Sequence, residues 1–314
     1  MAHARPGLVI AAFAAIYLIW GSTYLAIKLA IDTLPPLLMA GSRFLVAGPL
    51  LWLIVPGSRR TVPTRRDWLW AFVLGAFLLL IGNGVVTVVE GKMPSAVAAL
   101  LITSVPLWMA LLDWLAFRGP APTGFVGLGI LLGFGGVILL AGEDGGWVGG
   151  EVDYRYVVAI LLGCLCWATG SLLSRRGGIK LPILRSVALQ MFAGGILLTA
   201  AGLLSGEWAE VDLANASASS AWAWLYLVVF GSVIAFSAYS WLLSVRPSAM
   251  VSTYAFVNPV VAVLLGAAWL DEPITQRTVV ASTLIVAAVA LVTYAKSRKA
   301  AAPPLKPVES MPSK

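Results

Sequence analysis

Residues 94–106, PSAVAALLITSVP, return as residues 247–259, PSAMVSTYAFVNP, with Pro-Ser-Ala at the start and proline at the end of both stretches. A second set of residues recurs 147 positions later, pairing Trp20 with Trp167, Pro35 with Pro182, Arg43 with Gln190 and Gly48 with Gly195. Recurrence of this kind along one chain indicates an internal duplication, and a duplication determines the whole architecture. The chain is therefore built from two related halves.

The composition of both halves is that of a membrane protein. Of 314 residues, 60% are hydrophobic and only 11% are charged, more apolar than a water-soluble domain needs. Because about 20 apolar residues span a bilayer as a helix, we predict an all-α integral membrane fold with ten transmembrane helices, five in each half. They are expected at about 8–29, 34–55, 68–89, 94–117, 123–141, 154–174, 182–204, 220–243, 247–270 and 275–295.

Basic residues gather in alternate loops between these stretches. Arg59, Arg60, Arg65 and Arg66 fall in one such loop, and the tail after Ser297 is also basic. Since Lys and Arg accumulate on the cytoplasmic side, both termini are predicted to be cytoplasmic in the cell (inner or plasma) membrane. The net charge of +7 is thus explained by topology, and no nucleic-acid partner is expected. Five helices per half then require two inverted repeats, the arrangement used for alternating access.

The domain layout follows from this count. Residues 8–141 form the first repeat, 142–153 a Gly-rich external linker, 154–296 the second repeat, and 297–314 a disordered cytoplasmic tail. The first apolar stretch is longer than the core of a signal peptide and has a repeat partner, so we expect it to be retained.

Arg43 is the most informative polar residue. It lies within the second apolar stretch, where a charge is costly and marks a functional site or an ion pair. One interpretation is a clamp for a carboxylate or phosphate of the substrate; the other is a structural partner of an acid or of helix-end carbonyls. The equivalent position holds neutral Gln190, so the site is expected to be asymmetric.

Other candidates divide by chemistry. Asn83 and Asn258 offer hydrogen bonds to a ligand, or else bind neighbouring helices. Aromatic residues offer cavity walls or ordinary packing: Trp20, Trp108, Trp167, Tyr239 and Tyr254. Pro106 and Pro259 are expected to remove a hydrogen bond inside a helix, which suits gating or a static kink. Glu90 is a gate or proton carrier, or a solvated charge at a helix end.

Several chemistries lack the residues they require. The sole histidine is His3, and Cys164 and Cys166 diverge around a helix, so neither a metal site nor a cofactor is expected. No catalytic group is expected either, because no Asp/Glu pair or activated serine is evident. Gly129-x-x-x-Gly133 is a close-packing face, suited to a contact within the chain or between subunits of a homodimer.

Several motifs together resemble the EamA family of the drug/metabolite transporter superfamily: residues 19–24 (IWGSTY), Pro35-Pro36 with Arg43-Phe44, the Pro-Ser-Ala stretches, and Asn258-Pro259 with Asp271-Glu272-Pro273. The resemblance covers about residues 8–296. It implies ten helices in two inverted halves, with a central cavity lined by the first four helices of each half. In the first half, Arg118-Gly119-Pro120 departs from the acidic residue that precedes Pro273 in the second.

The sequence thus favours a secondary membrane transporter, an exporter of small amphipathic metabolites such as amino acids or related organic compounds. Two alternatives remain. One is a membrane scaffold or subunit without flux of its own, and the other is an integral-membrane enzyme acting on a lipid-linked substrate. The substrate, the direction of transport, ion coupling and oligomeric state do not follow from the sequence.

Overall fold

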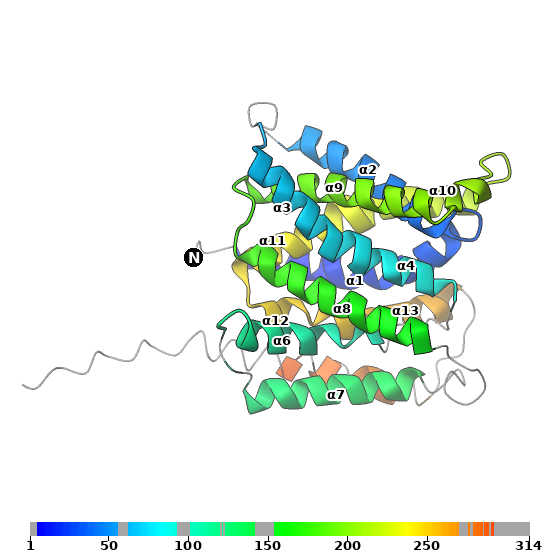
Figure 1. The fold of residues 1–314 in the computed structure, drawn as a ribbon. Coiled ribbons are helices and arrows are strands. Elements are labelled where there is room, and N and C mark those ends of the chain that lie inside the picture. Colours follow the sequence, from blue (N-terminus) through cyan, green and yellow to red (C-terminus); the bar gives the residue numbers. More distant parts are fainter. Residues whose placement is uncertain are drawn as a thin grey trace, which may run out of the picture.

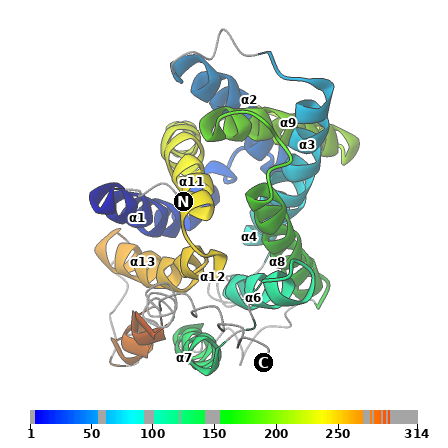
Figure 2. The same ribbon diagram turned by 90° about the vertical axis from the view of Figure 1, so that its left-hand side faces the viewer.

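The computed structural model describes residues 5–55, 62–92, 101–119, 121, 123–141 and 154–269, with short pieces between 276 and 291. In this part of the chain all regular structure is helical. The helices run side by side in Figure 1 and are seen end-on in Figure 2. Their bounds are α1 (Pro6–Ala30), α2 (Pro36–Ile54), α3 (Arg65–Gly75), η2 (Ala76–Asn83), α4 (Gly84–Glu90), α6 (Val105–Leu115), α7 (Gly124–Ala141), α8 (Tyr154–Arg175), α9 (Ile183–Leu204), η3 (Glu207–Glu210), α10 (Ala218–Tyr226), η4 (Leu227–Phe236), α11 (Ser237–Val245), α12 (Ser248–Val251) and α13 (Tyr254–Trp269).

Six helical stretches in the described residues are long and apolar enough to cross a membrane. They are Pro6–Ala30, Pro36–Ile54, Arg65–Glu90, Arg155–Arg175, Ile183–Leu204 and Ala218–Val245. Shorter apolar helices, α6 among them, accompany these six. The chain is therefore a multi-pass membrane protein. The predicted linker 142–153 and tail 297–314 lie outside the described residues, and the tenth predicted helix is described only in pieces.

The fourth and ninth predicted helices are interrupted. A turn at Thr103–Ser104 precedes α6, and a turn at Ser252–Thr253 separates α12 from α13. The expectation that Pro106 removes a hydrogen bond inside a helix was wrong, because the proline lies in the first turn of α6. A first-turn N–H has no intrahelical acceptor, so proline costs nothing there. Pro259 does lie inside its helix, α13.

Two of the long stretches contain π-helical segments at their centres. Segment η2 joins α3 to α4, and η4 joins α10 to α11. A π-helical turn widens the helix, and such turns are frequent at functional sites. Asn83 ends η2, and Gly231 lies in η4.

Helices α2 and α9 cross in close contact, side by side in both ribbon views (Figures 1 and 2). A Cβ atom added to Gly48 would lie 2.8 Å from the carbonyl oxygen of Ala188 and 2.8 Å from the amide nitrogen of Phe192. One added to Gly195 would lie 3.1 Å from the carbonyl oxygen of Gly41 and 2.7 Å from the amide nitrogen of Leu45.

These two glycine contacts are equivalent in the repeat register, since Gly48 corresponds to Gly195, Gly41 to Ala188, and Leu45 to Phe192. In each contact, a residue late in one helix meets residues early in the other. That pattern requires α2 and α9 to be antiparallel. The crossing therefore has local two-fold symmetry, with backbone packed against backbone.

Two carboxylates join the segments that flank α9 to neighbouring helices. Glu207, just beyond α9, accepts hydrogen bonds from the amides of Leu37 (3.1 Å) and Leu38 (2.9 Å) in the first turn of α2. Such first-turn amides have no acceptor within their own helix. Asp67, in α3, accepts a hydrogen bond of 2.9 Å from the amide of Lys180, shortly before α9 begins.

Asp67 also caps its own helix, because it accepts from the amide of Thr64 at 2.9 Å while Thr64 Oγ1 accepts from the amide of Asp67. Asp67→Ala is expected to lower the free energy of unfolding by about 1–3 kcal/mol, since it leaves two amides without acceptors. The thermal midpoint in detergent measures this loss. Asp212→Ala is the control, because this exposed carboxylate accepts hydrogen bonds within its own loop, from Asn215 and Ala214. Equal midpoints for both variants would contradict the role of Asp67.

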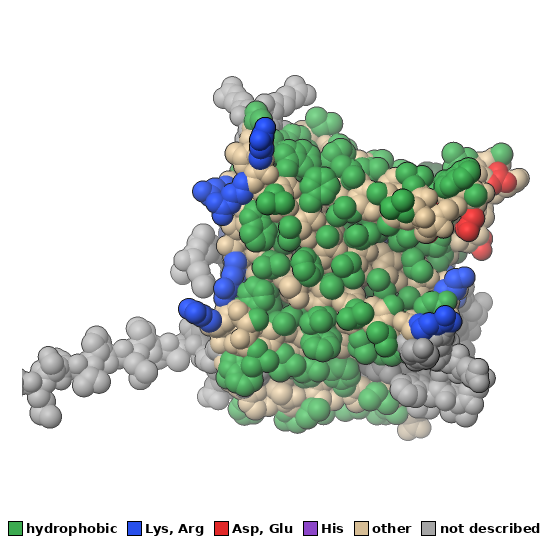
Figure 3. Space-filling view, viewed as in Figure 1, with side chains coloured by type: hydrophobic (Ala, Val, Ile, Leu, Met, Phe, Trp, Pro, Cys, Tyr) green, Lys and Arg blue, Asp and Glu red, His purple; other side chains and the backbone are tan. Residues whose placement is uncertain are grey.

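The charged side chains visible in Figure 3 lie at the two ends of the bundle. In Figure 3, Lys and Arg cluster at the end where α3 begins, with a smaller group at the opposite end, and the visible acids lie at the end where α10 begins. Between them the surface shown is mostly hydrophobic (Figure 3). Exposed apolar residues on α7 include Phe125 and Leu131. Gly133 faces inward, where an added Cβ would lie 2.6 Å from the ring of Phe256, so this glycine serves a contact within the chain.

Candidate functional site

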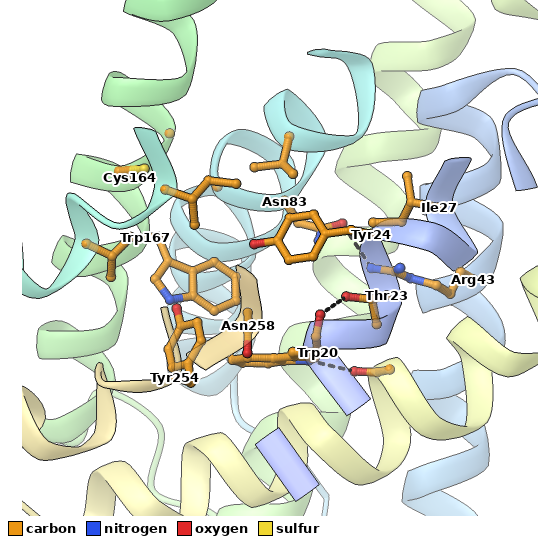
Figure 4. Close-up of a pocket in the computed structure, with 16 residues that line it drawn as sticks. Trp20, Thr23, Tyr24, Ile27, Arg43, Asn83, Cys164, Trp167, Tyr254 and Asn258 are labelled. Atoms are coloured by element: carbon orange, nitrogen blue, oxygen red, sulfur yellow. Dashed lines mark hydrogen bonds between the residues drawn. The ribbon is translucent and has the colours of Figure 1, made fainter. Parts of the chain in front are cut away.

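A cavity of about 100 Å³ lies between residues from both halves of the chain. Its lining comes from α1, α2, η2, α4, α6, α8, η4 and α13, and from Ile102 beside the first of the turns (Figure 4). We call it the central chamber. Six residues singled out from the sequence line it: Trp20, Arg43, Asn83, Trp167, Tyr254 and Asn258.

Arg43 provides the charge of the chamber. Its side chain is only 4% exposed, its Nη2 donates to Asn83 Oδ1 at 2.9 Å, and its guanidinium carbon lies 4.2 Å from the centre of the Phe44 ring. Nε of Arg43 is buried with no hydrogen-bond partner among the described residues, and no ion pair with a described carboxylate is formed. The guanidinium thus retains an unused donor in a low-dielectric environment, where an anion would be attracted strongly.

Four aromatic side chains predicted as cavity walls come together in one cluster. The ring of Trp20 lies 5.7 Å from Trp167, 5.0 Å from Tyr239 and 4.9 Å from Tyr254, centre to centre. Nε1 of Trp167 donates to the hydroxyl of Tyr239 at 3.1 Å. Tyr239 is completely buried and does not line the chamber. It contacts Trp167 on the side away from the chamber and accepts its hydrogen bond.

Acceptors complete the lining. Asn258 is 2% exposed, and its Oδ1 has no hydrogen-bond partner among the described residues. Nε1 of Trp20 donates to the carbonyl oxygen of Gly231 in η4 at 3.2 Å. The chamber therefore presents an unused donor on Arg43 and an unused acceptor on Asn258, on elements from opposite halves of the chain.

Sequence reasoning missed Thr23, Tyr24, Ile27 and Cys164. The first three follow Trp20 at helical spacings of three, four and seven, so all lie on one face of α1. Cys164 precedes Trp167 by one turn of α8 in the same way. Extending each aromatic candidate along its own helix face would have found them. Cys164 is buried at 3% exposure, with its thiol 3.7 Å from the carbonyl oxygen of Leu101.

The remaining predicted site residues lie elsewhere. Gln190 lines a different cavity, between α8, α9 and α11. Trp108, in α6, packs against the core without reaching the chamber lining, and Pro106 and Pro259 also lie outside that lining. Glu90 ends α4 and is 4% exposed, so it is buried rather than solvated, and it also lies outside the lining.

The chamber offers a ligand the unused Nε donor of Arg43 and the unused Oδ1 acceptor of Asn258. Among the described residues no group of three His, Cys, Asp or Glu side chains could hold a metal ion.

A multi-pass helical bundle with a buried, charged chamber at its centre is the architecture of a membrane transporter. The chain belongs to the EamA-like transporter family, whose sequence profile matches it twice, at residues 6–142 and 155–294. The resemblance noted from the sequence motifs is thereby confirmed.

Relatives extend along most of the chain. It is 39% identical over 298 residues to the uncharacterized inner membrane transporter YedA of Escherichia coli K12, covering 94% of this chain and 93% of that protein. It is 26% identical to the uncharacterized transporter YvbV of Bacillus subtilis, covering 91% and 92%. A solved crystal structure, described only as that of a protein, superposes with a TM-score of 0.76 at 22% identity, covering 94% of this chain and 99% of that one. The last likeness concerns the fold alone.

Proposed function

We propose that this protein is a secondary transporter that exports small amphipathic metabolites across the cell membrane by alternating access. In this proposal the central chamber binds the substrate, and Arg43 holds its anionic group. The observation that carries the proposal is the buried guanidinium of Arg43, which has an unused Nε donor and no ion-paired carboxylate among the described residues. Leaving a buried charge uncompensated is costly unless a ligand supplies the counter-charge.

The architecture proposed for this cycle is ten helices in two inverted five-helix repeats, residues 8–141 and 154–296, with cytoplasmic termini. The antiparallel, two-fold crossing of α2 and α9 supports it, because an axis perpendicular to the helices relates inverted repeats. The double match to the family profile supports the duplication. The amino acids and related organic compounds considered from the sequence are the first substrates to test.

The remaining chamber residues are assigned by chemistry. Asn258 accepts a hydrogen bond from a donor group of the substrate, and Asn83 orients the guanidinium of Arg43. Trp20, Trp167 and Tyr254 form the apolar wall. Such a mixture suits a solute with a charged end, a hydrogen-bonding group and an apolar body.

Uptake into proteoliposomes tests the proposal directly. Purified protein is reconstituted, and radiolabelled amino acids and organic acids are screened for exchange, with and without a pH gradient. Saturable flux of an anionic or zwitterionic solute is expected. If protein of normal thermal midpoint gives no flux with any compound, the transporter proposal is refuted for these solute classes.

The native cysteine offers a second measurement that needs no flux. In a Cys166→Ala variant, Cys164 is the single thiol and lines the chamber. A carboxylate such as propionate is expected to slow alkylation of Cys164 by N-ethylmaleimide, about fivefold at saturation, by occupying the chamber or closing it. Matched concentrations of propionamide are the control and should leave the rate unchanged. Equal slowing by both compounds would contradict an anion site.

A further inference from the structure

A second cavity, of about 170 Å³, lies near the end of the bundle where α8 ends and α9 begins. We call it the lower cavity. Its lining includes Gln190 and Ser174, which correspond in the repeat register to Arg43 and Ile27 of the central chamber. The two cavities therefore share two equivalent positions of the two halves, occupied by residues of different chemistry.

Fixed hydrogen bonds make the lower cavity rich in acceptors. Ser186 Oγ donates to the carbonyl oxygen of Leu181 at 3.1 Å, and Ser244 Oγ donates to that of Trp241 at 2.7 Å. A hydroxyl has one hydrogen, so once it is donated the oxygen can only accept from a ligand.

Gln190 adds a third acceptor. Its side chain is 2% exposed, and its Oε1 is buried with no hydrogen-bond partner among the described residues. A buried acceptor without a donor costs about 1–3 kcal/mol, and a ligand that supplies the donor would recover it. Arg175 is the one charged side chain in the described lining. It is exposed, so solvent and salt screen its charge.

We propose that the lower cavity is a second solute site, which binds hydroxyl or ammonium groups through Gln190, Ser186 and Ser244. A carboxylate has no hydrogen to donate, so it cannot satisfy the unpaired Oε1 of Gln190. The central chamber instead binds the anionic end of a solute, because its unused charged group, Nε of Arg43, is a hydrogen-bond donor. The inference extends the proposed function, but its test measures binding and needs no transport.

A reporter cysteine measures occupancy of the lower cavity. Cys164→Ala with Ser174→Cys places a thiol in its lining, and native Cys166 remains as a reference for reagent reactivity. Methyl methanethiosulfonate labels both thiols, and the ratio of the two rates is followed while glycerol, ethanolammonium chloride or sodium propionate is added. Glycerol or ethanolammonium is expected to lower the ratio, and propionate is expected to leave it unchanged.

Substitution of the acceptors decides the assignment. Gln190→Leu in the reporter protein is expected to raise the glycerol or ethanolammonium concentration for half-protection about tenfold, the effect of losing one buried hydrogen bond. Ser244→Ala is a milder second variant should Gln190→Leu lower the thermal midpoint. Protection by glycerol alone identifies a hydroxyl site, and protection by ethanolammonium alone identifies an ammonium site.

Three outcomes would overturn the proposal: no protection by either donor, equal protection by propionate, or unchanged protection in both acceptor variants. Arg43→Gln separates this site from the central chamber, because it should leave protection at position 174 intact. Failure of propionate to protect Cys164 would instead count against the proposed function and leave the lower cavity unaffected.

Discussion

Asn83→Asp is expected to weaken binding of organic anions in the central chamber about 10- to 100-fold, although Arg43 is still present. The amide oxygen of Asn83 already accepts from Arg43 Nη2 at 2.9 Å, so an aspartate of the same shape would form an ion pair there. The pair cancels the net charge that a substrate carboxylate would otherwise neutralise. Since a hydrogen bond to a charged group contributes about 1.5–3 kcal/mol, affinity should fall about 10- to 100-fold.

The measurement is the propionate concentration that half-protects Cys164, together with saturable flux of the organic acids that the wild type transports. Arg43→Gln should show a similar loss, and Arg43→Lys a smaller one, because lysine keeps the charge but lacks the planar fork. Asn215→Asp, in an exposed loop, is the matched control for adding a carboxylate. If Asn83→Asp binds propionate as the wild type does, Arg43 is a structural residue.

The second large effect is expected at the crossing of α2 and α9. Gly48→Ala and Gly195→Ala each place a Cβ within 2.8 Å of backbone atoms of the facing helix, and backbone cannot rotate away as a side chain can. Each substitution should cost about 1–3 kcal/mol through overpacking. The double variant should lose more than either single variant.

The thermal midpoint in detergent reports this effect. Gly127→Ala in α7 is the matched control, since an added Cβ there meets nothing within 4 Å. That substitution should be neutral or slightly stabilising, because alanine favours a helix over glycine. Equal midpoints for Gly195→Ala and Gly127→Ala would show that the two helices can separate without cost.

Much of this molecule was predictable from its apolar pattern. Helices α1, α2, α8 and α9 lie within about two residues of the predicted stretches, because long apolar runs between basic loops leave few alternatives. The interruptions at Thr103–Ser104 and Ser252–Thr253 were not predicted. A turn buried among helices depends on tertiary packing, and hydropathy averaged over a span does not register it.

Those residues of the candidate site whose side chains are unusual inside a membrane helix could be predicted from the sequence. Arg43, Asn83 and Asn258 stand out because polar groups in apolar helices are costly, and all three line the central chamber. Trp20 and Trp167 stand out because they are equivalent in the repeat register, and Tyr254 stands out as an aromatic beside the polar residues Ser252 and Thr253. Gln190 was grouped with Arg43 by symmetry, yet symmetry relates it to an equivalent place in the other half, which is a separate cavity.

The crossing of α2 and α9 has a consequence for how such a chain could arise. Gly48 meets the backbone at 188 and 192 in the way that Gly195 meets it at 41 and 45, so the contact is self-complementary. Two identical copies of one polypeptide make contacts of this isologous kind when they form a dimer. Each half therefore carries both surfaces of the α2–α9 contact. A gene half as long could have encoded a chain that dimerised through this contact, before gene fusion placed both copies in one reading frame.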